Sequence, residues 1–152
     1  MLIILFCFVF FLLDFGLKTI ITAKLAFNTA YPLIGNIVSL RLVHNTGVAF
    51  GLLQGKTNLV IFIGVAFIVV FLFFALREKH TPAKKVFLGM ILAGALGNLY
   101  DRVFLGYVID YIDLGWWPVF NLADSFITVG CAFFLVSCFL SDRKKSRDRF
   151  IA

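Results

Sequence analysis

The sequence predicts an α-helical integral membrane protein with four transmembrane helices. The composition is the first reason: 62% of the 152 residues are hydrophobic and only 14% are charged, whereas a typical soluble domain is about half apolar. The second reason is that the apolar residues form long runs, with a mean hydropathy of +1.02. The third is that basic residues gather at the ends of these runs, as they do beside membrane helices. Because no Pro- or Ser-rich linker divides the chain, we expect a single membrane domain over residues 1–152.

Four apolar runs predict the four spans. They cover roughly residues 2–23, 58–76, 86–100 and 125–140. Crossing the hydrocarbon core takes about 20 helical residues, so the last two spans must borrow residues from their flanks or tilt. The first run lacks a basic leading segment and a small-residue cleavage site, which favours a retained helix over a cleaved signal peptide.

The basic residues predict the orientation. Nine of the fourteen Lys and Arg fall in two clusters, within 77–85 and 143–149. Four spans place both clusters on one side of the membrane, and the positive-inside rule makes that side the cytoplasm. Both termini are then cytoplasmic, and segments 24–57 and 101–124 lie at the outer face. The net charge of +6 therefore indicates membrane lipids rather than nucleic acid as the partner.

The two outer segments differ from ordinary loops. Segment 37–52 mixes β-branched with polar residues and contains Asn45-Thr46-Gly47, a turn signal, so we expect a short strand or hairpin on the membrane surface. Segment 103–120 contains Trp116, Trp117 and Pro118, which are typical of an anchor at the membrane interface.

Asp14 lies inside the first predicted span. A charge at the centre of a membrane helix costs about 2.5–3.5 kcal/mol on insertion scales, so Asp14 is a candidate site residue. Lys18 follows one helical turn later on the same face and can neutralise it. Two interpretations stay open: an internal ion pair that fixes how the first helix packs, or a direct role in substrate handling.

Asn98, Asp101 and Arg102 stand at the outer end of the third predicted span. Asn98 and Asp101 are three residues apart, so they share one helix face. Two interpretations are open, and both can hold together. In the first, the three side chains support a polar site. In the second, Asp101 and Arg102 form an ion pair at the membrane interface that closes the helix end.

Asp110 and Asp124 are the candidate catalytic residues. If residues 103–120 fold back over the membrane surface, the two carboxyl groups can meet. Two carboxylates in contact share one proton, and such a pair can act as general base and general acid. The alternatives are that Asp124 caps the fourth helix and that Asp110 is a solvated loop acid.

Other chemistries find little support in the sequence. The cysteines lie inside apolar runs without metal-ligand spacing, and no zinc-protease, phosphate-loop or dinucleotide motif is present. We therefore expect neither a metal nor a cofactor. A small ion- or proton-coupled transporter using the same aspartates is the alternative function; it needs a polar path to the cytoplasmic side, yet the second and fourth spans nearly lack ionisable groups.

Five motifs in order make the chain resemble the bacterial lipoprotein signal peptidases (signal peptidase II) along essentially its whole length. They are Asp14-x-x-x-Lys18, Asn45-x-Gly47-x-Ala49-Phe50, Gly97-Asn98-x-x-Asp101-Arg102, Gly106-x-Val108-x-Asp110-Tyr111-Ile112 and Phe120-Asn121-x-Ala123-Asp124-Ser125. The last three in this order are highly specific, although any one alone is weak. The chain departs from the family at Phe15, where Gln is usual. It also has only thirteen residues between Asp110 and Asp124.

The resemblance implies a four-helix membrane fold with a small extracytoplasmic β-cradle, in the bacterial cytoplasmic membrane. It implies that Asp110 and Asp124 form a catalytic dyad. The substrate it implies is a diacylglyceryl-modified prolipoprotein, cut just before the lipidated cysteine, and globomycin-type cyclic peptides are the implied inhibitors. The polar residues that it places around the dyad are Asn45, Asn98, Asp101, Arg102 and Asn121. We expect the protein to be a monomer. Asp113 falls outside the family's catalytic pattern, so we interpret it as a loop acid.

Overall fold

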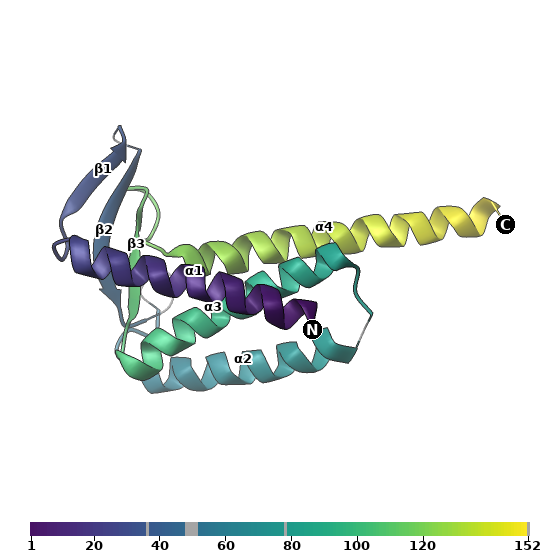
Figure 1. The fold of residues 1–152 in the computed structure, drawn as a ribbon, viewed down its shortest axis with the longest axis horizontal. Coiled ribbons are helices and arrows are strands. Elements are labelled where there is room, and N and C mark those ends of the chain that lie inside the picture. Colours follow the sequence, from purple (N-terminus) through teal and green to yellow (C-terminus); the bar gives the residue numbers. More distant parts are fainter. Residues whose placement is uncertain (36, 48–51, 78, 152) are drawn as a thin grey trace.

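The computed structural model describes residues 1–35, 37–47, 52–77 and 79–151, which form four helices and a three-stranded sheet (Figure 1). The elements in chain order are α1 (Leu2–Lys24), β1 (Ala30–Ile34), β2 (Val38–Asn45), α2 (Thr57–Arg77), α3 (Pro82–Phe104), β3 (Val108–Asp113) and α4 (Leu122–Ile151). The sheet lies across one end of the helices, and both termini lie at the other end (Figure 1). We call the first of these the sheet end.

All four helices are long and apolar enough to cross a membrane, which confirms the predicted fold class. The apolar part of α4 is Leu122–Ser141. The last two helices are longer than the runs that predicted them, because α3 extends over Pro82–Phe104 and α4 begins at Leu122. The predicted boundaries of segment 101–124 are therefore wrong: Asp101 lies in the last turn of α3, and Asp124 lies in the first turn of α4.

Large apolar side chains cover the outside of the bundle. Phe62, Phe74 and Phe139 are 70%, 64% and 71% exposed, and they belong to a broad apolar surface over the helices. Soluble proteins rarely expose contiguous apolar patches larger than a few hundred Å². The surface therefore fits lipid rather than water as its surroundings.

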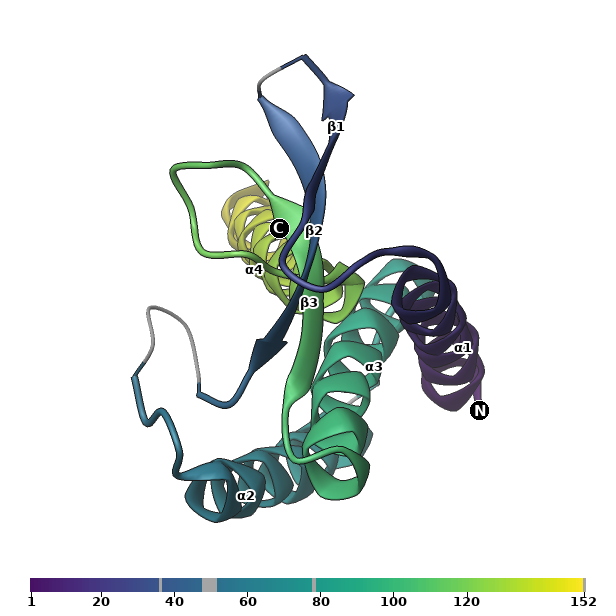
Figure 2. The ribbon, with the colours of Figure 1, turned by 90° about the vertical axis from the view of Figure 1, so that its left-hand side faces the viewer.

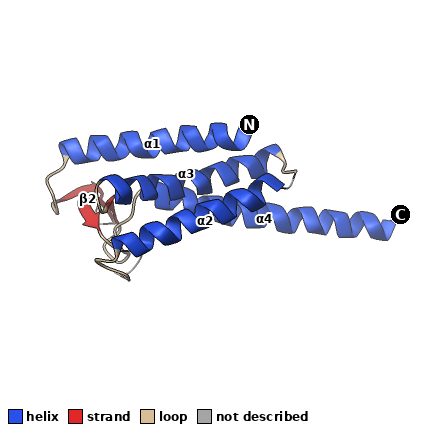
Figure 3. Cartoon of the chain, turned by 90° about the horizontal axis from the view of Figure 1, so that it is seen from below, coloured by secondary structure: helices blue, strands red, loops and turns tan. Residues whose placement is uncertain are grey.

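Helix α3 is the centre of the bundle and packs against each of the other three helices (Figures 2 and 3). Glycines permit its closest approaches. A Cβ on Gly97 would lie 2.5 Å from Asp14 Oδ2 of α1, and one on Gly94 would collide with the backbone oxygen of Ala123 in α4. Small residues at helix contacts are how membrane helices come together closely, and here they bring polar side chains of α1, α3 and α4 into contact.

The sheet is antiparallel with the order β1-β2-β3. The predicted strand within segment 37–52 is present as β2, but the predicted turn is not the hairpin turn. The hairpin joins β1 to β2 and turns before Val38, whereas Asn45-Thr46-Gly47 stands at the far end of β2; residues 48–51 lie outside the described part of the chain. Strand β3 pairs with β2 and was not predicted. Asp110 is therefore a strand residue and not a solvated loop acid.

Candidate active site

A returning segment after β3 brings the start of α4 to Asp110. Phe120 pairs with Ile112 of β3 through two backbone hydrogen bonds, of 2.7 and 3.1 Å. Asn121 follows directly and lies beside β3. The fold-back anticipated for residues 103–120 is thus present, but it runs along a strand, and β3 holds the loop in place.

The first backbone N–H groups of α4 are all bound by side chains. Helix starts leave about four such donors without an intrahelical partner. Here the N–H of Leu122 donates to Tyr111 Oη (3.1 Å) and that of Ala123 to Asp14 Oδ1 (2.9 Å). The N–H of Asp124 donates to Asn121 Oδ1 (2.9 Å), and the N–H of Asn121 donates to Asp124 Oδ2 (3.2 Å).

This arrangement corrects one alternative and ties three elements together. The reciprocal pair is a capping box, in which Asn121 is the cap and Asp124 is the third helical residue, so Asp124 is not the N-cap. Tyr111 of β3 and Asp14 of α1 hold the remaining donors. The position of Asp124 is consequently fixed relative to both a strand and another helix.

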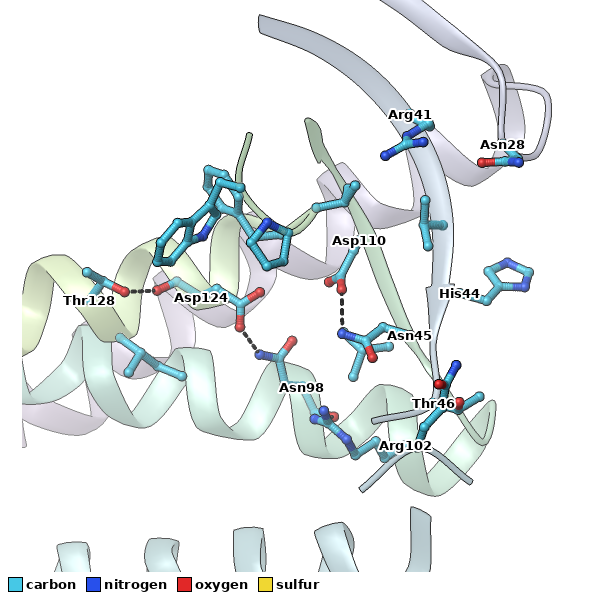
Figure 4. Close-up of a pocket in the computed structure, with 18 residues that line it drawn as sticks. Asn28, Arg41, His44, Asn45, Thr46, Asn98, Arg102, Asp110, Asp124 and Thr128 are labelled. Carbon is cyan, nitrogen blue, oxygen red and sulfur yellow. Dashed lines mark hydrogen bonds between the residues drawn. The ribbon is translucent and has the colours of Figure 1, made fainter. Parts of the chain in front are cut away.

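Asp110 and Asp124 both line a cavity of about 540 Å³ at the sheet end, a size usual for sites that hold small ligands. Figure 4 shows their carboxyl groups turned toward the same space between β3 and α4. Asp110 is 2% exposed, and Asp124 is partly exposed. Among the described residues neither forms an ion pair. Asn45, Asn98 and Arg102 line the same cavity.

Asn98 presents its amide nitrogen to Asp124. Lys18 Nζ can only donate, and it lies 3.3 Å from Asn98 Oδ1. That contact identifies the oxygen of the amide. Asn98 Nδ2 then donates to Asp124 Oδ1 at 2.7 Å, in agreement with the acceptor character of a carboxylate.

Two further asparagines present their amide nitrogens to Asp110. The backbone N–H of Asp124 identifies Oδ1 of Asn121, whose Nδ2 donates to Asp110 Oδ1 at 2.7 Å. The backbone N–H of Gly47 identifies Oδ1 of Asn45, whose Nδ2 donates to Asp110 Oδ2 at 2.9 Å. A carboxylate offers about four lone-pair positions, so acceptor capacity remains on the cavity side of Asp110.

Three buried charged side chains bind one another close to the cavity without lining it, and we call Asp14 and Asp101, joined by Lys18, the closed pair. Lys18 Nζ binds Asp14 Oδ2 at 2.9 Å and Asp101 Oδ2 at 2.8 Å, and all three side chains are at least 96% buried. Asp101 also accepts the backbone N–H of Ile109, at 3.1 Å. The predicted ion pair of Asp14 and Lys18 is confirmed. The predicted pairing of Asp101 with Arg102 is wrong, because Lys18 reaches across from α1 to Asp101.

Arg102 instead ties the end of α3 to the segment after β2. Its guanidinium donates to the backbone oxygen of Gly47 at 2.7 Å and to that of Asn98 at 3.2 Å. Gly47 is the residue that orients Asn45. Arg102 therefore supports the position of one of the amides that bind Asp110.

The surroundings of Asp110 favour its protonated form. Burial raises the pKa of Asp110 to about 7, and the nearby Asp124 carboxylate raises it too, while the hydrogen bonds from Asn45 and Asn121 act in the opposite direction. A carboxyl group with this pKa can hold a proton near neutrality and release it there. That property suits a group that exchanges protons during a reaction.

One wall of the cavity was missed by the sequence interpretation. Arg41, Val43, His44 and Asn45 line it from β2. Three of them, Arg41, Val43 and Asn45, have the period of two that places residues on one face of a strand. This alternation was the signal that could have found Arg41. Its Nε lies 2.8 Å from Asp113 Oδ2, and Asp113 is a buried residue at the end of β3, so its interpretation as a loop acid is wrong.

Within the described part of the chain, no group of three or more His, Cys, Asp or Glu side chains is arranged to hold a metal ion. The groups around the cavity include two carboxyl groups, three oriented amides and the guanidinium groups of Arg41 and Arg102.

Comparison with known proteins identifies the family to which the chain is similar. The family model for signal peptidase (SPase) II matches residues 6–140. The lipoprotein signal peptidase of Halothermothrix orenii is 39% identical over 137 residues, covering 90% of this chain and 93% of the relative. That of Syntrophomonas wolfei is 45% identical over 109 residues, covering 72% and 73%.

Solved structures agree with this match. Two structures, each described as a bacterial membrane enzyme, have TM-scores of 0.84 and 0.80 with this chain, both at 28% identity. The first covers 94% of this chain and 90% of its own, and the second covers 90% and 91%. With the family model covering most of its length, the chain belongs to the signal peptidase II family of lipoprotein-processing membrane proteases.

Proposed function

We propose that this protein is an aspartic endopeptidase that removes the signal peptide from diacylglyceryl-modified prolipoproteins, cutting just before the lipidated cysteine. Asp110 and Asp124 are its catalytic dyad. The observation that carries the proposal is that these two carboxyl groups, from a strand and a helix, face one cavity, and no cation in the described part of the chain is bonded to either of them.

The dyad can carry out hydrolysis with one shared proton. The ionised carboxylate removes a proton from a water molecule, and the water oxygen attacks the carbonyl carbon of the peptide bond before the cysteine. The protonated carboxyl group donates its proton to the substrate as the carbonyl oxygen gains charge. As the intermediate collapses, one of its hydroxyl groups returns a proton to the carboxylate that protonated it, the C–N bond breaks, and the carboxyl group that took a proton from water gives it to the amine of the cysteine, so the dyad again holds one proton.

The position of the site suits a substrate anchored in lipid. The positive-inside rule places the basic clusters, and with them both termini, in the cytoplasm. The sheet end then lies at the outer face of the membrane. A diacylglyceryl group sits in the outer leaflet, so the peptide bond beside it reaches the cavity without lipid being drawn into water.

The direct test is cleavage of a lipid-modified precursor by purified Asp110→Asn and Asp124→Asn variants. Both are expected to lose at least about 1,000-fold in kcat while inserting and folding as the unmodified protein does. Asp113→Asn is the matched control, since it removes an acid of the same strand that does not line the cavity. Near-normal cleavage by either dyad variant would refute the dyad.

A second test uses the substrate. An unmodified precursor with the same sequence, lacking diacylglycerol, is expected to remain uncut by the enzyme that cleaves the modified form. A globomycin-type cyclic peptide is expected to compete with the precursor, as the family resemblance implies. Equal cleavage of both precursors would show that the lipid is not part of recognition.

A further inference from the structure

A buried cation stands one side chain away from Asp124. The side chain of Lys18 is 3% exposed and does not line the cavity. An ammonium group has three N–H donors, and Lys18 has three partners: Asp14 at 2.9 Å, Asp101 at 2.8 Å and Asn98 Oδ1 at 3.3 Å. Two of these contacts balance charge. The third is to a neutral amide, so balancing charge does not explain it.

The contact with the neutral amide is one of three hydrogen bonds that fix which way Asn98 points. Asn98 Oδ1 accepts from Lys18 and also from Asn121 Nδ2, at 3.0 Å, while Asn98 Nδ2 donates to Asp124 at 2.7 Å. Rotating this amide by 180° would lose three hydrogen bonds at once. It would also place an NH₂ group against an ammonium and a carbonyl oxygen against a carboxylate.

We propose that Lys18 is a positioning residue for the proteolytic reaction: it holds the oxygen of Asn98 so that the N–H of Asn98 always faces Asp124. This inference rests on the proposed role of Asp124 in catalysis. A fixed N–H on one oxygen of Asp124 sets the direction of the carboxylate and leaves its free lone pairs toward the cavity. Lys18 acts through Asn98 and does not touch the substrate.

A matched pair of substitutions separates this role from charge balance. Lys18→Met and Lys18→Gln remove the same charge from side chains of similar length, but only the glutamine keeps N–H donors. We expect Lys18→Met to lose about 10- to 100-fold in kcat, the usual cost of losing a group that orients a reacting one. Lys18→Gln should stay clearly above it, and KM should be unchanged in both. Lys24→Met, at the exposed end of α1, is the control.

A double-substitution cycle tests the route through Asn98. If Lys18 acts by orienting Asn98, then Lys18→Met should cost almost nothing further in a protein that already carries Asn98→Ala, and the double variant should match Asn98→Ala within about threefold. If Lys18 only stabilises the fold, the two losses multiply. Equal kcat for the Met and Gln variants, or multiplied losses, would overturn the inference.

Folding is controlled by keeping the charge of the cluster constant. Lys18→Met leaves Asp14 and Asp101 facing each other, so the same Met and Gln pair is also made with Asp101→Asn. The three groups then carry −1 as before, and Asp14 still binds the start of α4. Thermal unfolding reports whether the pair is equally stable, and kcat is compared only between equally folded proteins. If Asp124→Asn itself retains cleavage, the proposed function fails, and that result is distinct from failure of this inference.

Discussion

Two pairs of aspartates lie close together at the sheet end and differ in what stands between them. Asp14 and Asp101 are joined by the ammonium of Lys18, which lies within 2.9 Å of both. Asp110 and Asp124 share a cavity and are bound by the neutral amides of three asparagines. The first pair is closed and charge-compensated, whereas the second is left with unsatisfied capacity facing an open space.

The difference teaches which buried acids can do chemistry in a membrane. A buried charge is tolerated when it is paired and fully hydrogen-bonded, and such a pair has little left to offer a substrate. A carboxyl pair without a bonded cation resists losing its last proton. Burial and the like charge of Asp124 accordingly raise the pKa of Asp110 to about 7.

The largest expected effect on stability comes from opening the closed pair. Asp14→Leu removes one of the two carboxylate partners of Lys18 and the acceptor for the N–H of Ala123 at the start of α4, and it should destabilise the protein by about 3–5 kcal/mol. Asp110→Asn should cost less, about 1–3 kcal/mol, because it removes a like charge but turns one NH₂ group toward the amide nitrogen of Asn45 or Asn121. Thermal unfolding in detergent measures both. If Asp110→Asn is as damaging as Asp14→Leu, the contrast between the pairs is wrong.

Asn121 has both a structural contact and a contact in the candidate active site, since it caps α4 and binds Asp110. Asn121→Ala should lose about 1 kcal/mol from the missing cap and about 10- to 100-fold in kcat from the missing amide. Asn121→Ser keeps a good capping oxygen but has no amide, so it should recover stability without recovering kcat. Unfolding curves and cleavage rates together check this, and recovery of both would show that capping alone matters.

The dependence of cleavage on pH should report the raised pKa of Asp110. The shared proton is lost as the pH rises, so kcat should fall on the alkaline side with an apparent pKa of about 7, a value that belongs to the pair. Asn45→Ala removes a hydrogen bond that favours the ionised form, so this limb should move to higher pH. A limb that moves to lower pH, or does not move, contradicts the assignment of Asn45.

The smallest effect is expected at the rim of the cavity. Arg41 pairs with Asp113 at 2.8 Å, but its side chain is 37% exposed, and ion pairs of this kind contribute about 0.2–1 kcal/mol. Arg41→Gln should therefore change stability by less than about 1 kcal/mol, and the change should shrink further in high salt. A loss of stability as large as that of Asp14→Leu would contradict this and show that the ion pair of Arg41 behaves as a buried one.

Much of the fold could be read from the sequence, and the misses have a common cause. The spans were found because apolar runs are local features, although α3 and α4 proved longer than their runs. Strand β3 was missed because Val108–Asp113 gains its strand character from pairing with β2, which lies more than sixty residues earlier. The turn signal Asn45-Thr46-Gly47 left a short strand or a hairpin open, because a turn signal does not say which strands it joins.

The candidate site could likewise be predicted in part: most of its residues were found, but most of their contacts were not. Spacing alone left Asp110 and Asp124 as one interpretation among others, and the ordered motifs named the rest of the polar residues. Their partners could not be read from spacing. Asp101 was paired with its neighbour Arg102, but Lys18 of α1 binds it. Arg41 and Asp113 were not connected, although the alternation along β2 contained the signal.

The sequence by itself determined that this chain has four apolar spans and that acids and asparagines concentrate at their ends and in the segments between them, because hydrophobicity and residue type are properties of short stretches. Only the tertiary structure decided which acids are neutralised and which face the cavity. Hydrogen bonds and ion pairs act over about 3 Å, and the ones that matter join residues 80 and 109 positions apart, as in Lys18 with Asn98 and Ala123 with Asp14. Close packing around α3 sets those distances, so it divides Asp14, Asp101, Asp110 and Asp124 into a closed pair and an open one.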